Sequence, residues 1–313
     1  MPTVSLPILD KLSLNHELSA SDSEGLTALI RQHINDRSMH IRYLGAWYHN
    51  YDYLNNWHLR LDGFSNAPIL LQTVHKYTGG DFRAEWNPNN LGPEGNQYLW
   101  EALEELLSTE YEPFLNNALV TRTDTAVDIT PLSPESIWVE VRGLQRGNTR
   151  TGQRGEVQSY ELGSRRSDLY FCIYNRNPED GHRISSDPYI TRLEARTKPR
   201  CTLRELRSIS NPFSRLNVVN AVDPDTLEQE HFRYIFFLDS VVRRGLQGAL
   251  RRIPRYETRE SYRQWICDRL CTDWFRPDLI WEDKQQMLDV LSLPPALTTR
   301  RRRRRRRRHE TSA

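Results

Sequence analysis

The stretch from Ser159 to Lys198 constrains the fold more than any other part of this chain. It reads SYELGSRRSDLYFCIYNR, followed by a polar loop and then YITRLEARTK. Apolar and polar side chains alternate on both sides of the basic, serine-rich segment 163–168, and this alternation predicts two strands joined by a turn. Residues 190–198 are predicted to form another short strand. The chain is therefore expected to contain an antiparallel sheet.

The period of two along a strand determines which side chains share a face. In the second strand, the phenols of Tyr170 and Tyr174 are predicted to lie on one face, about 13 Å apart at the rise per residue of a strand. In the strand 190–198, the carboxylate of Glu194 is flanked by Arg192 and Arg196 on one face. Tyrosine, carboxylate and arginine side chains together suit phosphodiester chemistry.

Nine consecutive arginines, Arg300 to Arg308, account for more than the whole positive charge of the chain. The 313 residues include 43 Lys and Arg and 41 Asp and Glu, which gives a net charge of +2. Without these nine, 34 basic residues face 41 acidic ones, so the rest of the chain is acidic by seven. A broad basic face that grips duplex DNA is therefore not expected, and nucleic-acid binding is confined to local patches and the arginine run.

No secretory signal and no long apolar run occur in the sequence. The start, MPTVSLPILDKLSL, carries charge within its apolar stretch, and no later segment approaches the length of a membrane span. We therefore expect a cytoplasmic protein without a membrane partner.

The remaining periodicities predict a mixture of helices and strands. Amphipathic patterns predict helices over 23–36, 97–107, 227–252, 259–274 and 281–291. Alternating or aromatic-rich patterns predict strands within 42–61 and over 82–86, 121–129 and 137–142. The tetrad Asn87-Pro88-Asn89-Asn90 is predicted to be a turn.

Two aspartates in the predicted strand 121–129 share one face, although acidic residues disfavour strands. Asp124 and Asp128 supply hard oxygen ligands, which suit Mg²⁺ or Mn²⁺. For Asp124, capping a turn or pairing with Arg122 is an equally good interpretation. That alternative is weaker for Asp128, because it lies between Val127 and Ile129.

The glycine-rich segment 143–155 carries three arginines and no acidic residue: Arg146, Arg150 and Arg154. It lacks a Gly-Lys-Ser/Thr ending and so is not a phosphate-binding loop. It is either an exposed hairpin tip or a contact with the DNA backbone, and its charge favours the contact.

The segment GSRRSDLYFCIYNR, 163–176, resembles the serine/arginine turn and tyrosine-bearing strand of the replication initiation factor family. This family contains rolling-circle initiators of certain plasmids and filamentous phages, together with related relaxases of mobile elements. FRAEWNPNNL (82–91), TRTDTAVDI (121–129) and ITRLEAR (190–196) agree with it in order and spacing. The resemblance covers roughly residues 55–200. Arg176 stands where the family usually has lysine, so the charge is kept.

The resemblance implies an α+β fold. Its core would be a ferredoxin-like, split β-α-β antiparallel sheet related to the His-hydrophobe-His endonucleases, with a helical C-terminal portion. The expected division is a polar lead-in at 1–21, a nicking and DNA-binding domain at 22–204, a helical domain at 205–293 and a disordered arginine-rich tail at 294–313. Because no His-x-His pair occurs in the sequence, any metal must be held mainly by carboxylates.

The resemblance also implies a reaction. A tyrosine hydroxyl attacks a phosphorus of single-stranded DNA at an origin, forming a 5′-phosphotyrosine and leaving a 3′-OH that primes synthesis. We hypothesise Tyr170 as the nucleophile because it lies nearer the serine/arginine turn, with Tyr174 as its rival. Mg²⁺ or Mn²⁺ would be held by Asp128, Asp124 and Glu194. Arg192 or Arg196 would pair with phosphate oxygens, or else simply neutralise Glu194.

DNA contacts are expected from the turn residues Ser164, Arg165, Arg166 and Ser167. The implied partners are single-stranded or hairpin origin DNA, a host helicase, a single-strand-binding protein and a second copy of the chain. A relaxase for mobile-element transfer and a noncatalytic DNA-binding regulator on the same fold are the alternative functions, and an RNA-binding protein is a more distant one.

Overall fold

The computed structural model describes residues 1–46, 52–64, 67–144, 146–151, 157–176, 189–222 and 232–298. Its strands are β1 (Thr3–Val4), β2 (Ile8–His16), β3 (Ile41–Tyr43), β4 (Tyr53–Leu59), β5 (Ile69–His75), β6 (Phe82–Trp86), β7 (Leu119–Thr130), β8 (Ile137–Val141), β9 (Gly147–Thr151), β10 (Val157–Gly163), β11 (Leu169–Asn175), β12 (Thr191–Thr197), β13 (Cys201–Thr202) and β14 (Leu216–Asn220).

Within these ranges the α-helices are α1 (Ala20–Asp36), α2 (Pro88–Leu107), α3 (Tyr111–Asn117), α4 (Phe232–Arg251), α5 (Tyr256–Leu270), α6 (Pro277–Glu282), α7 (Lys284–Asp289) and α8 (Pro295–Thr298). Short 3₁₀ turns are η1 (Ser108–Glu110), η2 (Pro134–Ser136), η3 (Glu205–Ser208) and η4 (Pro212–Arg215). The fold is therefore α+β, with a large antiparallel sheet and several helices.

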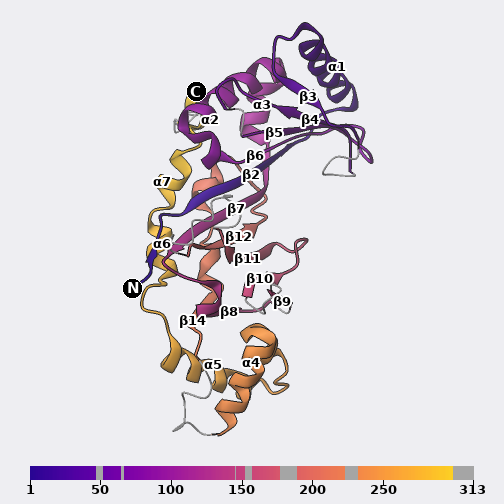
Figure 1. Cartoon of the computed structure of the whole chain (residues 1–313). Coiled ribbons are helices and arrows are strands. Elements are labelled where there is room, and N and C mark those ends of the chain that lie inside the picture. Colours follow the sequence, from indigo (N-terminus) through magenta and orange to yellow (C-terminus); the bar gives the residue numbers. More distant parts are fainter. Residues whose placement is uncertain are drawn as a thin grey trace, which may run out of the picture.

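Most of the described strands belong to one large sheet. Its described strands follow the order β3-β4-β5-β6-β2-β7-β12-β11-β10-β9, with β1 and β13 pairing to β7, while β8 and β14 form a separate two-stranded sheet. Figure 1 shows α1 beside β3, β4 and β5 at one end of the molecule and α4 and α5 at the other.

Strand β2 lies in the middle of this sheet, between β6 and β7. The expectation of a polar lead-in over 1–21 is therefore wrong for this strand. Leu9, Leu12 and Leu14 are almost completely buried. A shift of register between Leu9 and Lys11 interrupts the alternation, so the sequence does not show a simple period of two.

Helix α2 connects two strands that flank β2. Because β6 and β7 both pair antiparallel with β2, they run parallel to each other. Similarly, β2 and β5 flank β6, and α1 lies in the connection between them. Helix α1 packs on β5, α2 packs on β2, and the two helices contact each other, so they cover the same face of the sheet.

The tetrad predicted as a turn is instead the beginning of α2. The Asn87 side chain accepts a hydrogen bond from the Asn90 N–H at 2.9 Å, and Pro88 occupies the first turn of the helix. Asparagine at an N-cap and proline directly after it are favourable helix-start residues. The prediction failed because turns and helix starts use the same residue types.

The two faces of the central strands differ in chemistry. One face contributes Phe82, Val127, Phe171 and Leu193 to the main hydrophobic core. The opposite face carries charged and phenolic side chains, as the period of two predicted. We call this second side the polar face; on the strands from β6 to β9, and at Arg176 just after β11, its described charged members are Asp10, Lys11, Arg83, Glu85, Arg122, Asp124, Asp128, Arg150, Glu161, Arg176, Arg192, Glu194 and Arg196.

The C-terminal portion adds helices, but it also completes the main core. Leu206, Phe213 and Leu291 belong to that core, and the Trp100 indole N–H donates to the Leu291 carbonyl at 2.7 Å. Strand β14 pairs with β8, so residues 205–293 are not purely helical. The division into two domains stays a prediction.

Several predicted segments differ from the structure or lie outside its described residues. The predicted loop 143–155 contains β9, which pairs with β10. The predicted helix 281–291 is split between α6 and α7. Pro295 begins α8 and so does not end the folded structure. The start of the predicted helix 227–252 and the arginine run lie outside the described residues.

The central position of β2 predicts a large stability difference between two leucine truncations. Leu12 is fully buried, whereas Leu6, just before the strand, is 48% exposed. We expect Leu12→Ala to lower the free energy of unfolding by about 2–5 kcal/mol. The matched Leu6→Ala change should cost far less in urea unfolding. Equal losses would contradict the central placement of β2.

Candidate functional site

The site is built from rows of side chains that cross β7, β12 and β11 on the polar face. In one row, Asp124 lies opposite Arg196, which lies opposite Tyr170. We call these three the Tyr170 row. Antiparallel pairing in this register places directly opposite side chains within contact distance.

A second row repeats the same order of residue types four positions along each strand. Asp128 lies opposite Arg192, which lies opposite Tyr174. We call these three the Tyr174 row. Both predicted phenols, both predicted arginines and both predicted aspartates thus lie on one face of three adjacent strands.

In the Tyr170 row, Asp124 is buried and receives two guanidinium groups. Arg122 donates from Nε to Asp124 Oδ1 at 2.8 Å, and Arg196 donates from Nε to the same oxygen at 3.2 Å. The alternative interpretation, pairing of Asp124 with Arg122, is therefore confirmed. The guanidinium of Arg196 also lies over the Tyr170 ring, 5.4 Å from its centroid.

The Tyr170 phenol is enclosed by its neighbours. The residue is only 3% exposed. Burial raises the pKa of Tyr170, although a hydrogen bond with Arg165 partly lowers it. Both the enclosure and the raised pKa oppose attack by this phenol on a large substrate.

In the Tyr174 row, Asp128 holds two arginines. Arg192 makes a bidentate pair, from Nε to Oδ1 at 2.7 Å and from Nη2 to Oδ2 at 2.9 Å. Arg176 donates from Nη1 to Oδ2 at 2.6 Å. Burial opposes ionisation of Asp128, but its hydrogen bonds and charge interactions with Arg192 and Arg176 lower its pKa overall.

Solvent access differs within the Tyr174 row. The Arg192 side chain is 8% exposed, whereas that of Arg176 is 34% exposed. Tyr174 is half-buried and interacts electrostatically with Arg192. The row therefore combines a buried arginine, Arg192, with a more exposed one, Arg176, beside the half-buried phenol of Tyr174.

The row is tied to the start of α2 through Asp10. Arg192 Nη1 lies 3.4 Å from Asp10 Oδ1, and the Asn87 amide donates to the same oxygen at 3.0 Å. Asn87 is also the N-cap of α2. Asn87 therefore links Asp10 of the site to the start of α2.

Glu194 lies between the two rows, opposite Ala126 and Cys172. Burial and the negative charges of Asp124 and Asp10 raise the pKa of Glu194 to about 7. Arg196, at 3.8 Å, opposes this effect only in part. The Cys172 thiol is half-buried, and loss of solvent raises its pKa to about 11, so it is a poor nucleophile.

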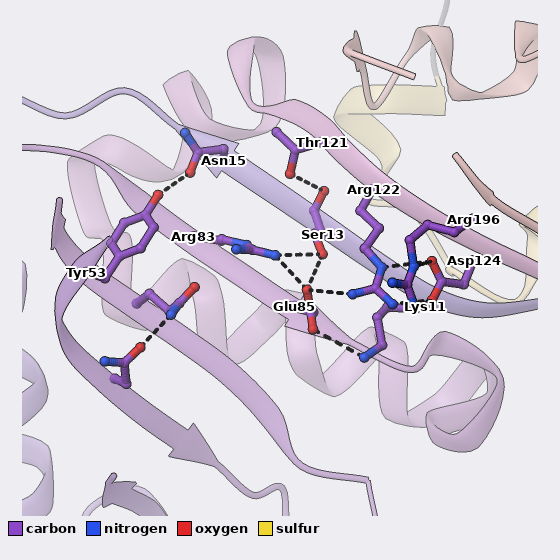
Figure 2. Close-up of polar contacts among 12 residues, drawn as sticks. Lys11, Ser13, Asn15, Tyr53, Arg83, Glu85, Thr121, Arg122, Asp124 and Arg196 are labelled. Carbon is purple, nitrogen blue, oxygen red and sulfur yellow. Dashed lines mark hydrogen bonds and ion pairs between the residues drawn. The ribbon is translucent and has the colours of Figure 1, made fainter. Parts of the chain in front are cut away.

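The charge network continues from β7 across β2 to β6 (Figure 2). Glu85 accepts a hydrogen bond from Ser13 at 2.6 Å and pairs with Arg83 at 2.7 Å and Lys11 at 3.3 Å. Burial opposes ionisation of Glu85, but these partners and Arg122 lower its pKa to about 2. The contacts of the polar face thus form two clusters of alternating charge, one extending from Arg196 through Asp124 to Glu85 and the other centred on Asp128.

The three carboxylates predicted to hold Mg²⁺ or Mn²⁺ do not fit a shared ion. Asp124 and Asp128 are four residues apart on one strand, which separates them by about 13 Å. Each is already hydrogen-bonded to two arginines, and Glu194 carries a raised pKa. Across the described ranges, no group of three or more His, Cys, Asp or Glu residues could hold a metal ion. The metal stays a prediction without a fitting ligand set.

The serines of the predicted DNA-binding turn close the turn itself. Ser167 Oγ accepts a hydrogen bond from the Ser164 N–H at 3.0 Å and donates to the Ser164 carbonyl at 2.5 Å. Arg165 and Arg166 are exposed, and Arg165 lies 3.3 Å from Glu161. The serines are therefore occupied in local structure, and DNA binding by the two exposed arginines stays a prediction.

Two of the other predicted DNA-binding arginines lie at the β9 edge. Arg146 and Arg150 are exposed, and Arg150 pairs with Glu161 at 2.8 Å. Arg154 lies outside the described residues.

Sequence reasoning missed Asp10 and the part of the network on β2 and β6. The alternation in FRAEW was a usable signal, because it places Arg83 and Glu85 on one face. Asp10 gave no such signal. The register shift between Leu9 and Lys11 places the consecutive residues Asp10 and Lys11 on the same face of the sheet, which a period of two does not predict.

No family model and no curated protein match this chain. Among solved structures, the chain is similar to the rolling circle replication initiator protein from Geobacillus stearothermophilus, at 14% sequence identity and a TM-score of 0.40. The alignment covers 78% of this chain and 97% of that chain. In the described part of the chain, no helix has the length and apolar character needed to cross a membrane.

The buried pair in the Tyr174 row predicts a large loss of stability for Asp128→Asn. Because Arg192 would remain buried without its carboxylate, we expect the free energy of unfolding to fall by about 3–5 kcal/mol. The matched control is Asp239→Asn, since Asp239 and Arg243 form an exposed pair on α4. That control should cost less than about 1 kcal/mol in urea unfolding. Similar losses would show that the Asp128 pair is not buried in solution.

Glu194 predicts a pH-dependent contribution to stability. Its folded pKa, about 7, lies above the ordinary value of 4.5, so the folded state holds the proton more tightly. The resulting stability is fully present below pH 4.5 and is lost as the pH rises through 7. We expect Glu194→Gln to become more stable relative to the unsubstituted protein across this window, by on the order of 1 kcal/mol or more. If the stabilities of the two proteins changed in parallel with pH across this window, the raised pKa of Glu194 would be contradicted.

Proposed function

We propose that this chain nicks and rejoins single-stranded DNA through a phosphotyrosine intermediate, and so initiates rolling-circle replication. The observation that carries the proposal is the Tyr174 row, in which a half-buried phenol lies opposite an arginine fixed by an aspartate. The resemblance of residues 163–176 to the tyrosine strand of the initiator family supports the same chemistry.

Tyr174 is the better nucleophile of the two phenols. Tyr170 is 3% exposed and lies under the Arg196 guanidinium, so a phosphodiester has little access to it. Tyr174 is half-buried and has Arg176 nearby on the same face. We therefore replace the initial hypothesis of Tyr170 with Tyr174, and assign Tyr170 to packing and to holding Arg196.

The reaction exchanges one phosphodiester for another. The Tyr174 hydroxyl oxygen forms a bond to phosphorus while the bond from phosphorus to the 3′ oxygen breaks. The phenol proton passes to water, and the leaving 3′ oxygen takes up a proton to become a hydroxyl. Because a phosphodiester is retained on the tyrosine, the strand can be rejoined by the reverse reaction.

The polar face supplies a local surface for the DNA strand. Among the described residues from β6 to β9, it carries seven cationic groups and six carboxylates: Lys11, Arg83, Arg122, Arg150, Arg176, Arg192 and Arg196 against Asp10, Glu85, Asp124, Asp128, Glu161 and Glu194. This local balance contrasts with the chain outside the arginine run, which is acidic by seven. It agrees with binding through a limited patch.

We also propose that β2, β5, β6 and β7, together with α1 and α2, form the ferredoxin-like core. The strand order β7-β2-β6-β5, with a helix in each of two crossovers, supports this assignment. Strands β12, β11 and β10 extend the sheet beyond β7, and they carry the tyrosines on that extension.

The proposal predicts which tyrosine becomes linked to DNA. The purified chain is incubated with Mg²⁺ and a pool of single-stranded oligonucleotides with a randomised central segment, and covalent complexes are recovered under denaturing conditions. We expect Tyr174→Phe to reduce the covalent complex by at least about a thousandfold. Tyr170→Phe, the matched control, should retain it.

The site of attachment is read by sequencing the peptide that carries DNA. DNA on Tyr170 would reverse the assignment of the nucleophile. No covalent complex from the folded, unsubstituted chain would instead favour the noncatalytic DNA-binding regulator. A relaxase would give the same covalent product, and the sequences recovered from the pool would then be compared with transfer origins and replication origins.

A further inference from the structure

Among the described residues, the charged groups that contact Asp128 and its arginines balance one another. Asp10 and Asp128 contribute two negative charges, and Arg176 and Arg192 contribute two positive charges, with contacts of 2.6 to 3.4 Å joining them in a chain. A divalent cation needs carboxylate ligands whose charge is available to it. Here a cation would have to displace charge-assisted hydrogen bonds while it lies next to two guanidiniums.

We propose that Arg176, positioned by Asp128, binds the scissile phosphate in place of a divalent cation, so that the nicking reaction proceeds without bound metal. This inference rests on the proposed function and specifies how its site binds phosphate. It also replaces the expectation that Asp124, Asp128 and Glu194 bind Mg²⁺ or Mn²⁺ for the chemical step.

The placement of Arg176 fits this role. It follows Tyr174 by two positions, and its N–H still pairs with the Ile190 carbonyl at 2.9 Å, so the strand geometry continues to this residue. The two side chains therefore project from the same face. With 34% of its side chain exposed, Arg176 is more accessible than Arg192, and Asp128 fixes its Nη1.

The chemistry needs no further co-reactant. As the Tyr174 oxygen bonds to phosphorus and the 3′ oxygen leaves, Arg176 donates N–H hydrogen bonds to the nonbridging oxygens. The guanidinium acts only as a hydrogen-bond donor and keeps its positive charge throughout. Water accepts the phenol proton and supplies the proton for the 3′ oxygen. Arg176 is thus a catalytic residue, and Asp128 is a positioning residue.

The first test is the effect of removing the Arg176 guanidinium. We expect Arg176→Ala to slow formation of the covalent complex with the randomised single-stranded pool by about 10²–10³-fold. Free guanidinium ion at low, nondenaturing concentration should restore part of the rate. Arg176→Lys keeps the charge but loses the planar fork, and should show an intermediate rate. Arg243→Gln, which removes an exposed arginine of α4 from an ion pair, is the matched control and should leave the rate unchanged.

The second test concerns the metal directly. The covalent complex is measured after exhaustive treatment with EDTA, and with phosphorothioate oligonucleotides in Mg²⁺ or Mn²⁺. We expect equal rates with and without EDTA. The slowing caused by sulfur at a nonbridging position should not be relieved by Mn²⁺, because a guanidinium and not a metal ion contacts that position.

The possible outcomes separate this inference from the proposed function. A covalent complex that forms only after Mg²⁺ is restored, or relief of the sulfur effect by Mn²⁺, would overturn the inference and leave the proposed function standing. An Arg176→Ala variant that is folded and reacts at the full rate would also overturn it. Absence of any covalent complex, with or without metal, would overturn the proposed function and the inference together.

Discussion

The pairing of β7 with β12 sets two aspartates directly opposite two arginines, and the polar face depends on this register. Asp124 meets Arg196 and Asp128 meets Arg192 across the same pair of strands. A slip of one residue would move these charges into the hydrophobic core and bring Val127 to the surface. The charge pattern therefore specifies the alignment of the strands as well as the chemistry of the face.

Burying so many charged side chains costs free energy, and this cost bears on the function of the polar face. Removing charges from water is unfavourable, and buried ion pairs often contribute little net stability compared with apolar side chains of similar volume. Asp124 and Arg192 are 2% and 7% exposed, so both are largely desolvated. A network of this kind fixes the directions of its guanidiniums. Fixed donors are what recognition of a phosphate requires, because they need not be reorganised when the ligand arrives.

The sequence was most informative where alternation was unbroken. The hairpin of β10 and β11 and the shared face of Tyr170 and Tyr174 followed from the period of two. The sequence did not reveal the register between strands that are far apart in the chain, and so it did not show that Asp128 would hold two arginines. Strand β2 was not predicted either, because the register shift after Leu9 breaks the alternation and places the consecutive residues Asp10 and Lys11 on one face. The ligand roles predicted for the aspartates rest on residue type and on their shared face, whereas the structure pairs each aspartate with arginines from its own and neighbouring strands.

The Asn87 side chain makes two hydrogen bonds that together join the site to the start of α2. Its side-chain oxygen caps the first turn of α2, while its amide nitrogen holds Asp10, the second carboxylate on Arg192. These two hydrogen bonds hold Asp10, and through it Arg192, in a fixed position relative to the first turn of α2. Because α2 packs on β2 and contacts α1, the helical layer on the core face braces the polar groups on the other face of the sheet.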